Sequence, residues 1–154
     1  KNHPQFESIA KQIESALVER EIQVVASDDL LSILTTKDKI ADNSLWSEEF
    51  LAKKAAMGTV DGLENAIEFI NTHSGGHSNI ILTENTTDAA TFMEQIDSAA
   101  VYHNASTRFT DGGQMGVGAE LAISTDKLHH RGPLGLKQLV TNKYHVLGNG
   151  QVRV

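Results

Sequence analysis

The sequence predicts an α/β protein built around a parallel sheet, and three observations lead to that fold class. Apolar segments of strand length alternate with segments of helical period between residues 61 and 103. The helical segments are long enough to serve as right-handed crossovers between parallel strands. A polar loop begins at Asn104, directly after an apolar run, and parallel sheets bind ligands at the carboxyl ends of their strands.

The first predicted elements are a helix and a strand. After Pro4, apolar residues recur at spacings of three and four, which predicts an amphipathic helix from about Gln5 to Arg20. A β-branched run predicts a strand over residues 21–26, ended by the polar residues 27–29. Residues 30–34 are predicted to form a short helix or an irregular apolar segment, and Trp46 is expected to be a buried anchor for its loop.

The middle of the chain carries the clearest alternation of elements. A weak strand is predicted over residues 55–60, followed by a helix capped by Asp61, with Glu64 in the capping-box position and an end near His73. The next elements are a strand over residues 80–82, a helix over 86–96 and a strand over 99–103.

The last third is less regular. Residues 119–125 fit a strand or a helical turn, residues 128–135 a turn rich in glycine and proline, and residues 136–139 a short helix. Alternation over residues 144–147 predicts a terminal strand with one free face. Because a lone strand leaves its edges unpaired, we expect this strand to pair with another lobe or another subunit.

Composition excludes several classes of function. The chain has 154 residues and a net charge of −7, without a basic stripe, so no nucleic-acid partner is expected. No apolar run is long enough to span a membrane and no signal peptide is apparent, so we expect a soluble, cytoplasmic protein without a membrane partner. The chain begins with Lys1 rather than methionine, and we therefore expect it to be a piece of a longer protein.

The chemistry available to the chain is limited by what it lacks. It has no cysteine, and hence no thiol nucleophile, and it has no G-x-S-x-G motif. Its seven histidines lack metal-ligand spacing, so no metal site is predicted. The loop over residues 104–118 combines hydroxyls, Arg108 and four glycines. It suits an oxyanion, although an ordinary surface loop explains the same composition.

Long segments of the sequence resemble one enzyme family. The segments NASTRFTDGGQMGVGAELAIST, LHHRGPLGL and KYHVLGNGQVRV are similar to the C-terminal part of gamma-glutamyl phosphate reductase, also called glutamate-5-semialdehyde dehydrogenase, of the aldehyde dehydrogenase superfamily. The resemblance extends from about Trp46 to Arg153. It implies an NADPH-dependent oxidoreductase of proline biosynthesis that converts gamma-glutamyl phosphate to glutamate-5-semialdehyde and phosphate. A cysteine thiolate forms the acyl intermediate in that family.

The resemblance also implies a division of the chain and a set of site residues. Residues 1–139 correspond to a partial catalytic α/β lobe with a substrate-anchor loop over 104–118, and residues 140–154 to a C-terminal strand that pairs in a homo-oligomer or with another lobe. The nucleophilic cysteine and the N-terminal lobe that mainly binds NADP are expected upstream, so the fragment is predicted to be inactive alone. The implied substrate-binding residues, which would surround the glutamyl carboxylate or the departing phosphate, are Asn104, Ser106, Thr107 and Arg108.

Two features of the sequence fit more than one interpretation. Glu49 falls where many aldehyde dehydrogenases place a glutamate on the nicotinamide ribose, but the superfamily pattern E-x-F-G-P is here EFLAK, so Glu49 also fits a structural carboxylate. The alternative to a reductase fragment is a stand-alone, non-catalytic α/β module that binds a ligand or a partner.

Overall fold

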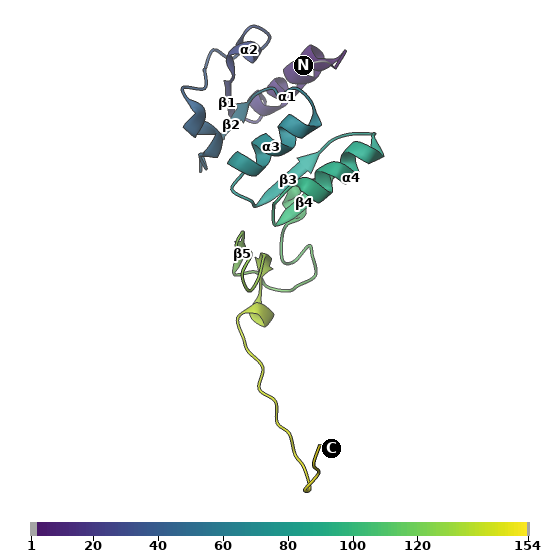
Figure 1. Cartoon of the computed structure of the whole chain (residues 1–154). Coiled ribbons are helices and arrows are strands. Elements are labelled where there is room, and N and C mark those ends of the chain that lie inside the picture. The colour runs from purple at the N-terminus through teal and green to yellow at the C-terminus, as the bar shows by residue number, and fades with distance from the viewer. Residues whose placement is uncertain (1–2, 154) are drawn as a thin grey trace. The chain divides into compact units, whose positions relative to one another are not determined.

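The computed structural model describes residues 3–153, and the chain separates into two compact units, residues 1–107 and residues 108–154. The described residues of the first unit form four α-helices and four strands in alternating order (Figure 1). These elements are α1 (Phe6–Val18), β1 (Gln23–Ala26), α2 (Asp28–Leu31), β2 (Lys54–Met57), α3 (Leu63–His73), β3 (Ser78–Ile81), α4 (Thr86–Gln95) and β4 (Ala100–His103).

The strands of this unit form two parallel pairs, which confirms the predicted α/β class. Strand β1 pairs with β2, from Gln23 opposite Lys54 to Ala26 opposite Met57. Strand β3 pairs with β4, from Ser78 opposite Ala100 to Ile81 opposite His103. Helix α4 connects β3 to β4, as expected for a crossover between parallel neighbours.

Each strand pair has its own apolar core. Helix α1 and the segment after β1 pack on the first pair, and the fully buried side chain at the centre of this cluster is that of Leu30. Ile67 of α3, Phe92 of α4 and Ile96, the residue after α4, form the second cluster, against which Ile81 and Val101 pack. The residues of β2, β3 and β4 are only half-buried, although their apolar runs are typical of strands covered on both faces.

A buried carboxylate ties α1 to the segment that follows α2. The side chain of Glu14 is 3% exposed and accepts hydrogen bonds from the backbone N–H groups of Thr35, at 2.9 Å, and Thr36, at 2.7 Å. Burial by itself would raise the pKa of Glu14, but these hydrogen bonds and the charge of Lys37 outweigh burial and lower it. Glu14 is therefore held in its ionised form.

Two helix starts differ in how they are capped. Asp61 does not cap α3, so the predicted capping box with Glu64 is wrong: the N-cap is Gly62, at φ +94°, without a side-chain cap. Glycine adopts this left-handed backbone region readily, whereas other residues are strained there. Helix α4 is capped by Asn85, whose side chain accepts from the amides of Thr87 and Asp88.

The second unit is built around a short antiparallel pair. Strand β5 (Ala122–Ser124) pairs with β6 (Gly132–Leu134), and a 3-10 turn over Leu136–Gln138 follows. The predicted strand over residues 144–147 is not formed: no pairing is assigned to residues 139–153, and Leu147 is 97% exposed. A strand needs a hydrogen-bonded neighbour, so pairing of this segment with another lobe or subunit stays a prediction.

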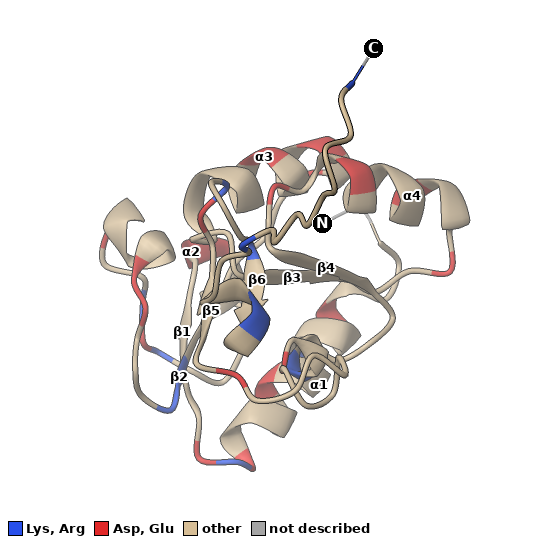
Figure 2. Ribbon diagram, turned by 90° about the horizontal axis from the view of Figure 1, so that it is seen from below, with Lys and Arg blue, Asp and Glu red and all other residues tan. Residues whose placement is uncertain are grey.

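The longest helix in the described part of the chain, α1, has 13 residues, and the other helices are shorter. None of them is long and apolar enough to cross a bilayer. Among residues 3–153, no group of three or more His, Asp or Glu side chains could hold a metal ion. Figure 2 shows acidic positions on α3 and α4, and neither helix contains lysine or arginine.

Candidate functional site

The predicted substrate loop begins at the carboxyl end of β4, where Asn104 clamps two chain segments together. Its backbone is left-handed, at φ +51°, which asparagine tolerates better than most residues. The side-chain Oδ1 accepts from the N–H of Thr83 at 3.0 Å, and Nδ2 donates to the carbonyl of Thr83 at 2.9 Å. The side-chain amide of Asn104 therefore positions the loop that follows β3.

His103 strengthens the same clamp. Its Nε2 lies 2.9 Å from the carbonyl oxygen of Thr83. A carbonyl oxygen can only accept a hydrogen bond, so Nε2 carries a proton and donates it. Two side chains from the end of β4 thus fix the end of β3, which makes a firm base for the residues that follow.

Those residues form an exposed turn. Thr107 opens a 3-10 turn over Thr107–Phe109, with Ser106 just before it and Arg108 inside it. The side chains of Ser106 and Arg108 are exposed, and that of Thr107 is half-buried. Hydroxyl groups and a planar guanidinium are the donors that carboxylate and phosphate oxygens accept, so this turn has the chemistry of an anion site.

The glycine-rich part of the loop folds on itself. The Asp111 carboxylate accepts from the amide of Gln114 at 2.9 Å, and Glu120 accepts from the amide of Gly112 at 2.6 Å. The amides of Met115, Gly116 and Val117 bond to carbonyls within the loop. The sequence suggests that these glycines open backbone amides to a ligand, but in this conformation five amides are already paired and two carboxylates lie beside them. Within this loop, the segment 104–108 is therefore the better candidate for an anion site.

Glu49 lies apart from regular structure, between the 3-10 turn over Asn43–Ser47 and strand β2. Its side chain is exposed. The next residue, Phe50, is covered by the ammonium of Lys54, 4.6 Å from the ring centroid. An exposed carboxylate can accept hydrogen bonds from ribose hydroxyls, so the position of Glu49 is compatible with a cofactor contact and equally with a surface role.

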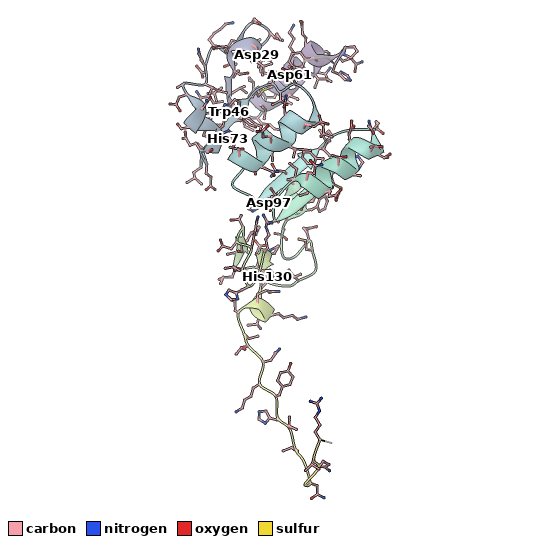
Figure 3. All side chains as sticks on the ribbon, in the orientation of Figure 1. Asp29, Trp46, Asp61, His73, Asp97 and His130 are labelled. Atoms are coloured by element: carbon pink, nitrogen blue, oxygen red, sulfur yellow. The ribbon has the colours of Figure 1, made fainter. Side chains whose placement is uncertain are left out.

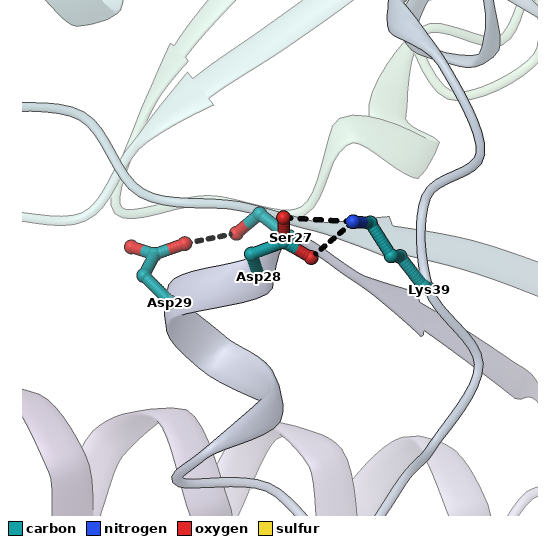
Figure 4. A network of polar contacts seen from close by, with 4 residues as sticks. All are labelled: Ser27, Asp28, Asp29 and Lys39. Carbon is teal, nitrogen blue, oxygen red and sulfur yellow. Dashed lines mark hydrogen bonds and ion pairs between the residues drawn. The ribbon is translucent and has the colours of Figure 1, made fainter.

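A second strand end carries a polar cluster that the sequence analysis missed. Asp29, after β1, accepts from the hydroxyl of Ser27 at 2.5 Å and from that of Thr59, after β2. On the other side of Ser27, Lys39 pairs with Asp28 at 2.8 Å (Figure 4). Hydroxyl and carboxylate residues directly after two strands are a signal that could have identified this cluster, since parallel strands bring their carboxyl ends together.

Aromatic side chains lie beside this cluster. Trp46 meets the ring of Phe69 edge to face, with centroids 5.1 Å apart, and the tilted ring of His73 lies 4.7 Å from that of Phe69, centroid to centroid. Figure 3 labels Trp46 and His73. The hydroxyl of Ser47 lies 2.9 Å from Nδ1 of His73. Trp46 is half-buried against α3, so the expected loop anchor is present but is not fully enclosed.

The fold and the strand-end loops together define an α/β protein whose polar loops follow parallel strands, as in ligand-binding and catalytic domains. The chain is homologous over most of its length to the gamma-glutamyl phosphate reductases. It is 49% identical over 135 residues to the gamma-glutamyl phosphate reductase of Halothermothrix orenii, which covers 88% of the chain and 32% of that protein. It is 47% identical to that of Idiomarina loihiensis, over 90% of the chain and 33% of the relative.

A solved structure gives the same result. The crystal structure of gamma-glutamyl phosphate reductase from Thermotoga maritima superimposes with a TM-score of 0.81 at 44% sequence identity, over 96% of this chain and 36% of that one. No protein-family model matches the chain. The chain thus spans about a third of the length of the curated relatives it matches.

Proposed function

We propose that this chain is the C-terminal part of an NADPH-dependent reductase that converts gamma-glutamyl phosphate to glutamate-5-semialdehyde and phosphate in proline biosynthesis, in the cytoplasm. The observation that carries the proposal is the homology to gamma-glutamyl phosphate reductases at 44–50% identity over about nine tenths of the chain. The chain matches about a third of those proteins, so the reaction belongs to the longer polypeptide rather than to these residues alone.

The proposed division of labour follows from the residues present. Reduction of an acyl phosphate through an acyl-enzyme needs a strong nucleophile, and this chain has no cysteine. The nucleophile is therefore supplied from outside these residues, and the fragment alone does not turn over. NADPH supplies the hydride when bound, and from this chain Glu49 would accept hydrogen bonds from its ribose.

We assign substrate binding to the exposed turn after β4. Arg108 would pair with the glutamyl carboxylate or the phosphate, and the hydroxyls of Ser106 and Thr107 would add hydrogen bonds. Asn104, which the resemblance places at the substrate, would act by holding the base of this turn through Thr83.

A chimera tests the proposal. This chain would replace the corresponding third of the Halothermothrix orenii reductase, to which it is 49% identical. The reverse reaction would be measured, in which glutamate-5-semialdehyde reduces NADP in the presence of phosphate. We expect activity from the chimera and none from the chain alone. Arg108→Ala in the chimera should raise KM for semialdehyde or phosphate at least tenfold and leave KM for NADP unchanged, because a charge-assisted pair contributes about 1.5–3 kcal/mol.

Arg20→Ala is the matched control, since Arg20 is also exposed and its guanidinium donates to the carbonyl of Ala16 in the preceding helix α1. An Arg108→Ala chimera with unchanged KM and kcat would contradict the assignment of Arg108. A correctly folded chimera without activity would favour the alternative, a non-catalytic α/β module that binds a ligand or partner by itself.

We also propose that residues 140–154 pair with another lobe or a second subunit of a homo-oligomer. Tyr144 and Val146 are 86% and 89% exposed, and they alternate with polar residues as strand residues do. Light scattering should show a smaller assembly when the chain is truncated after Leu139. The same mass before and after truncation would argue against this role.

A further inference from the structure

A cavity of about 380 Å³ lies at the carboxyl ends of β1 and β2. Its walls come from these strand ends, from the loop that carries Trp46 and from α3, and most of them are apolar. The lining residues are Trp46, Gly58, Val60, Ala66, Phe69 and Ile70, with Ser27 and Thr59 at the polar end. Its size lies within the range of small-molecule sites, about 300–1,000 Å³.

The aromatic wall depends on a single glycine. A Cβ at Gly58 would lie 2.5 Å from Cη2 of Trp46, so only glycine lets the indole lie against the end of β2. The indole meets Phe69 edge to face. A flat ligand ring can pack against the apolar surface and the π face of such a pair.

The polar end of the cavity presents hydrogen-bond acceptors. The hydroxyls of Ser27 and Thr59 both donate to the carboxylate of Asp29, which can only accept. Each hydroxyl has one proton, so what remains for a ligand is the lone pairs of the two oxygens. The cavity is therefore set to receive N–H donors rather than carbonyl or phosphate oxygens.

The charges near the cavity favour a cation. Asp29 lies behind the two hydroxyls, and α3, which forms one wall, carries Glu64 and Glu68 and no lysine or arginine. Asp61 and Glu68 line an adjoining hollow that shares Val60 and Phe69 with the cavity. Lys39 is close in the chain but is held by Asp28.

We propose that this cavity binds a flat aromatic ring bearing a cationic N–H donor group of the amidine or guanidine class, with the ring against Trp46 and Phe69 and the donor on Ser27 and Thr59. A cation beside an indole face gains further stabilisation. The ligand has the opposite charge to the anionic substrate proposed for the turn after β4, and the cavity shares no lining residue with that turn.

Benzamidine and benzoate form a suitable probe pair, because they have similar shape and opposite charge. Trp46 is the only tryptophan of the chain, so its fluorescence reports directly on the cavity wall. Titration of the full chain with benzamidine should change the fluorescence saturably, and benzoate should bind at least tenfold more weakly. Equal affinity for the two probes, or no saturable change with benzamidine, would overturn the proposal.

Variants assign the binding to the cavity. Thr59→Val and Ser27→Ala should each weaken benzamidine binding about tenfold, since each removes one hydrogen bond to a charged group. Thr86→Val is the matched control, because Thr86 is an exposed hydroxyl residue at the start of α4, and it should bind benzamidine as the unmodified chain does.

Ala66→Leu provides a second test that leaves the polar cluster intact. The larger side chain would fill the cavity from α3 and should abolish saturable binding, while circular dichroism shows an unchanged fold. A folded Ala66→Leu variant that binds benzamidine normally would place the probe elsewhere and overturn the proposal, even if the polar variants failed to fold.

Discussion

Replacing Glu14 by glutamine tests whether one buried carboxylate holds α1 to the segment after α2. Glu14 uses its two oxygens for the amides of Thr35 and Thr36. A glutamine has one acceptor oxygen, so one of those N–H groups would face an NH₂ group instead. An unsatisfied buried donor costs about 1–3 kcal/mol, and the remaining bond loses its charge assistance. We expect Glu14→Gln to lower the free energy of unfolding by about 2 kcal/mol.

The pH dependence of this loss has a definite sign. The pKa of Glu14 is lowered in the folded chain, so its ionised form stabilises the fold at neutral pH. That contribution is present above the unfolded carboxyl pKa, about 4.3, and is lost as the pH falls through the lower folded pKa. The difference in the free energy of unfolding between the original chain and the Glu14→Gln variant should therefore become smaller as the pH falls.

Unfolding in urea, monitored by circular dichroism, measures this difference in the free energy of unfolding. Glu19→Gln is the control, because Glu19 is exposed at the end of the same helix and should change stability by less than about 0.5 kcal/mol. A Glu14→Gln variant as stable as the original chain at neutral pH, or a gap that stays constant into acid, would refute the reasoning.

Three further substitutions follow from the structure. Gly58→Ala should push the Trp46 ring outward, shift its emission to longer wavelength and cost about 1–3 kcal/mol in thermal unfolding. Asn85→Ala removes the cap of α4 and should lower stability to urea by about 1 kcal/mol. Asn104→Gly keeps the left-handed backbone but loses both hydrogen bonds to Thr83, so the amide of Thr83 should exchange hydrogen faster by at least tenfold.

The regular elements were predictable because period and element length identify them. The helices α1, α3 and α4 begin and end within about two residues of the expected positions, and the strands before and after α4 pair in parallel as their apolar runs indicate. The N-terminus of α3 was missed because Asp61 and Gly62 both suit a helix start. Only the backbone angle of Gly62 decides between them.

The candidate sites were predictable only in part. The composition of the loop after β4 indicates anion chemistry, but the pairing of Asp111 and Glu120 with loop amides depends on long-range folding that no local pattern reveals. The cavity beside Trp46 was missed for the same reason. Its hydroxyls, Ser27 and Thr59, are distant in sequence and meet only when β1 and β2 pair.

The β3–α4–β4 segment, residues 78–103, also suggests an order of folding. Both strands, their crossover helix and the buried side chains of Phe92 and Ile96 come from one short continuous stretch of chain. Joining β1 to β2 instead closes a long connection in which the only helices are a single four-residue turn and a 3-10 turn. Contacts between residues close in sequence form sooner, because less chain entropy is lost in closing them. We therefore expect amides of β3 and β4 to gain protection first in a refolding experiment, and the β1–β2 pair, with its cavity, to assemble afterwards.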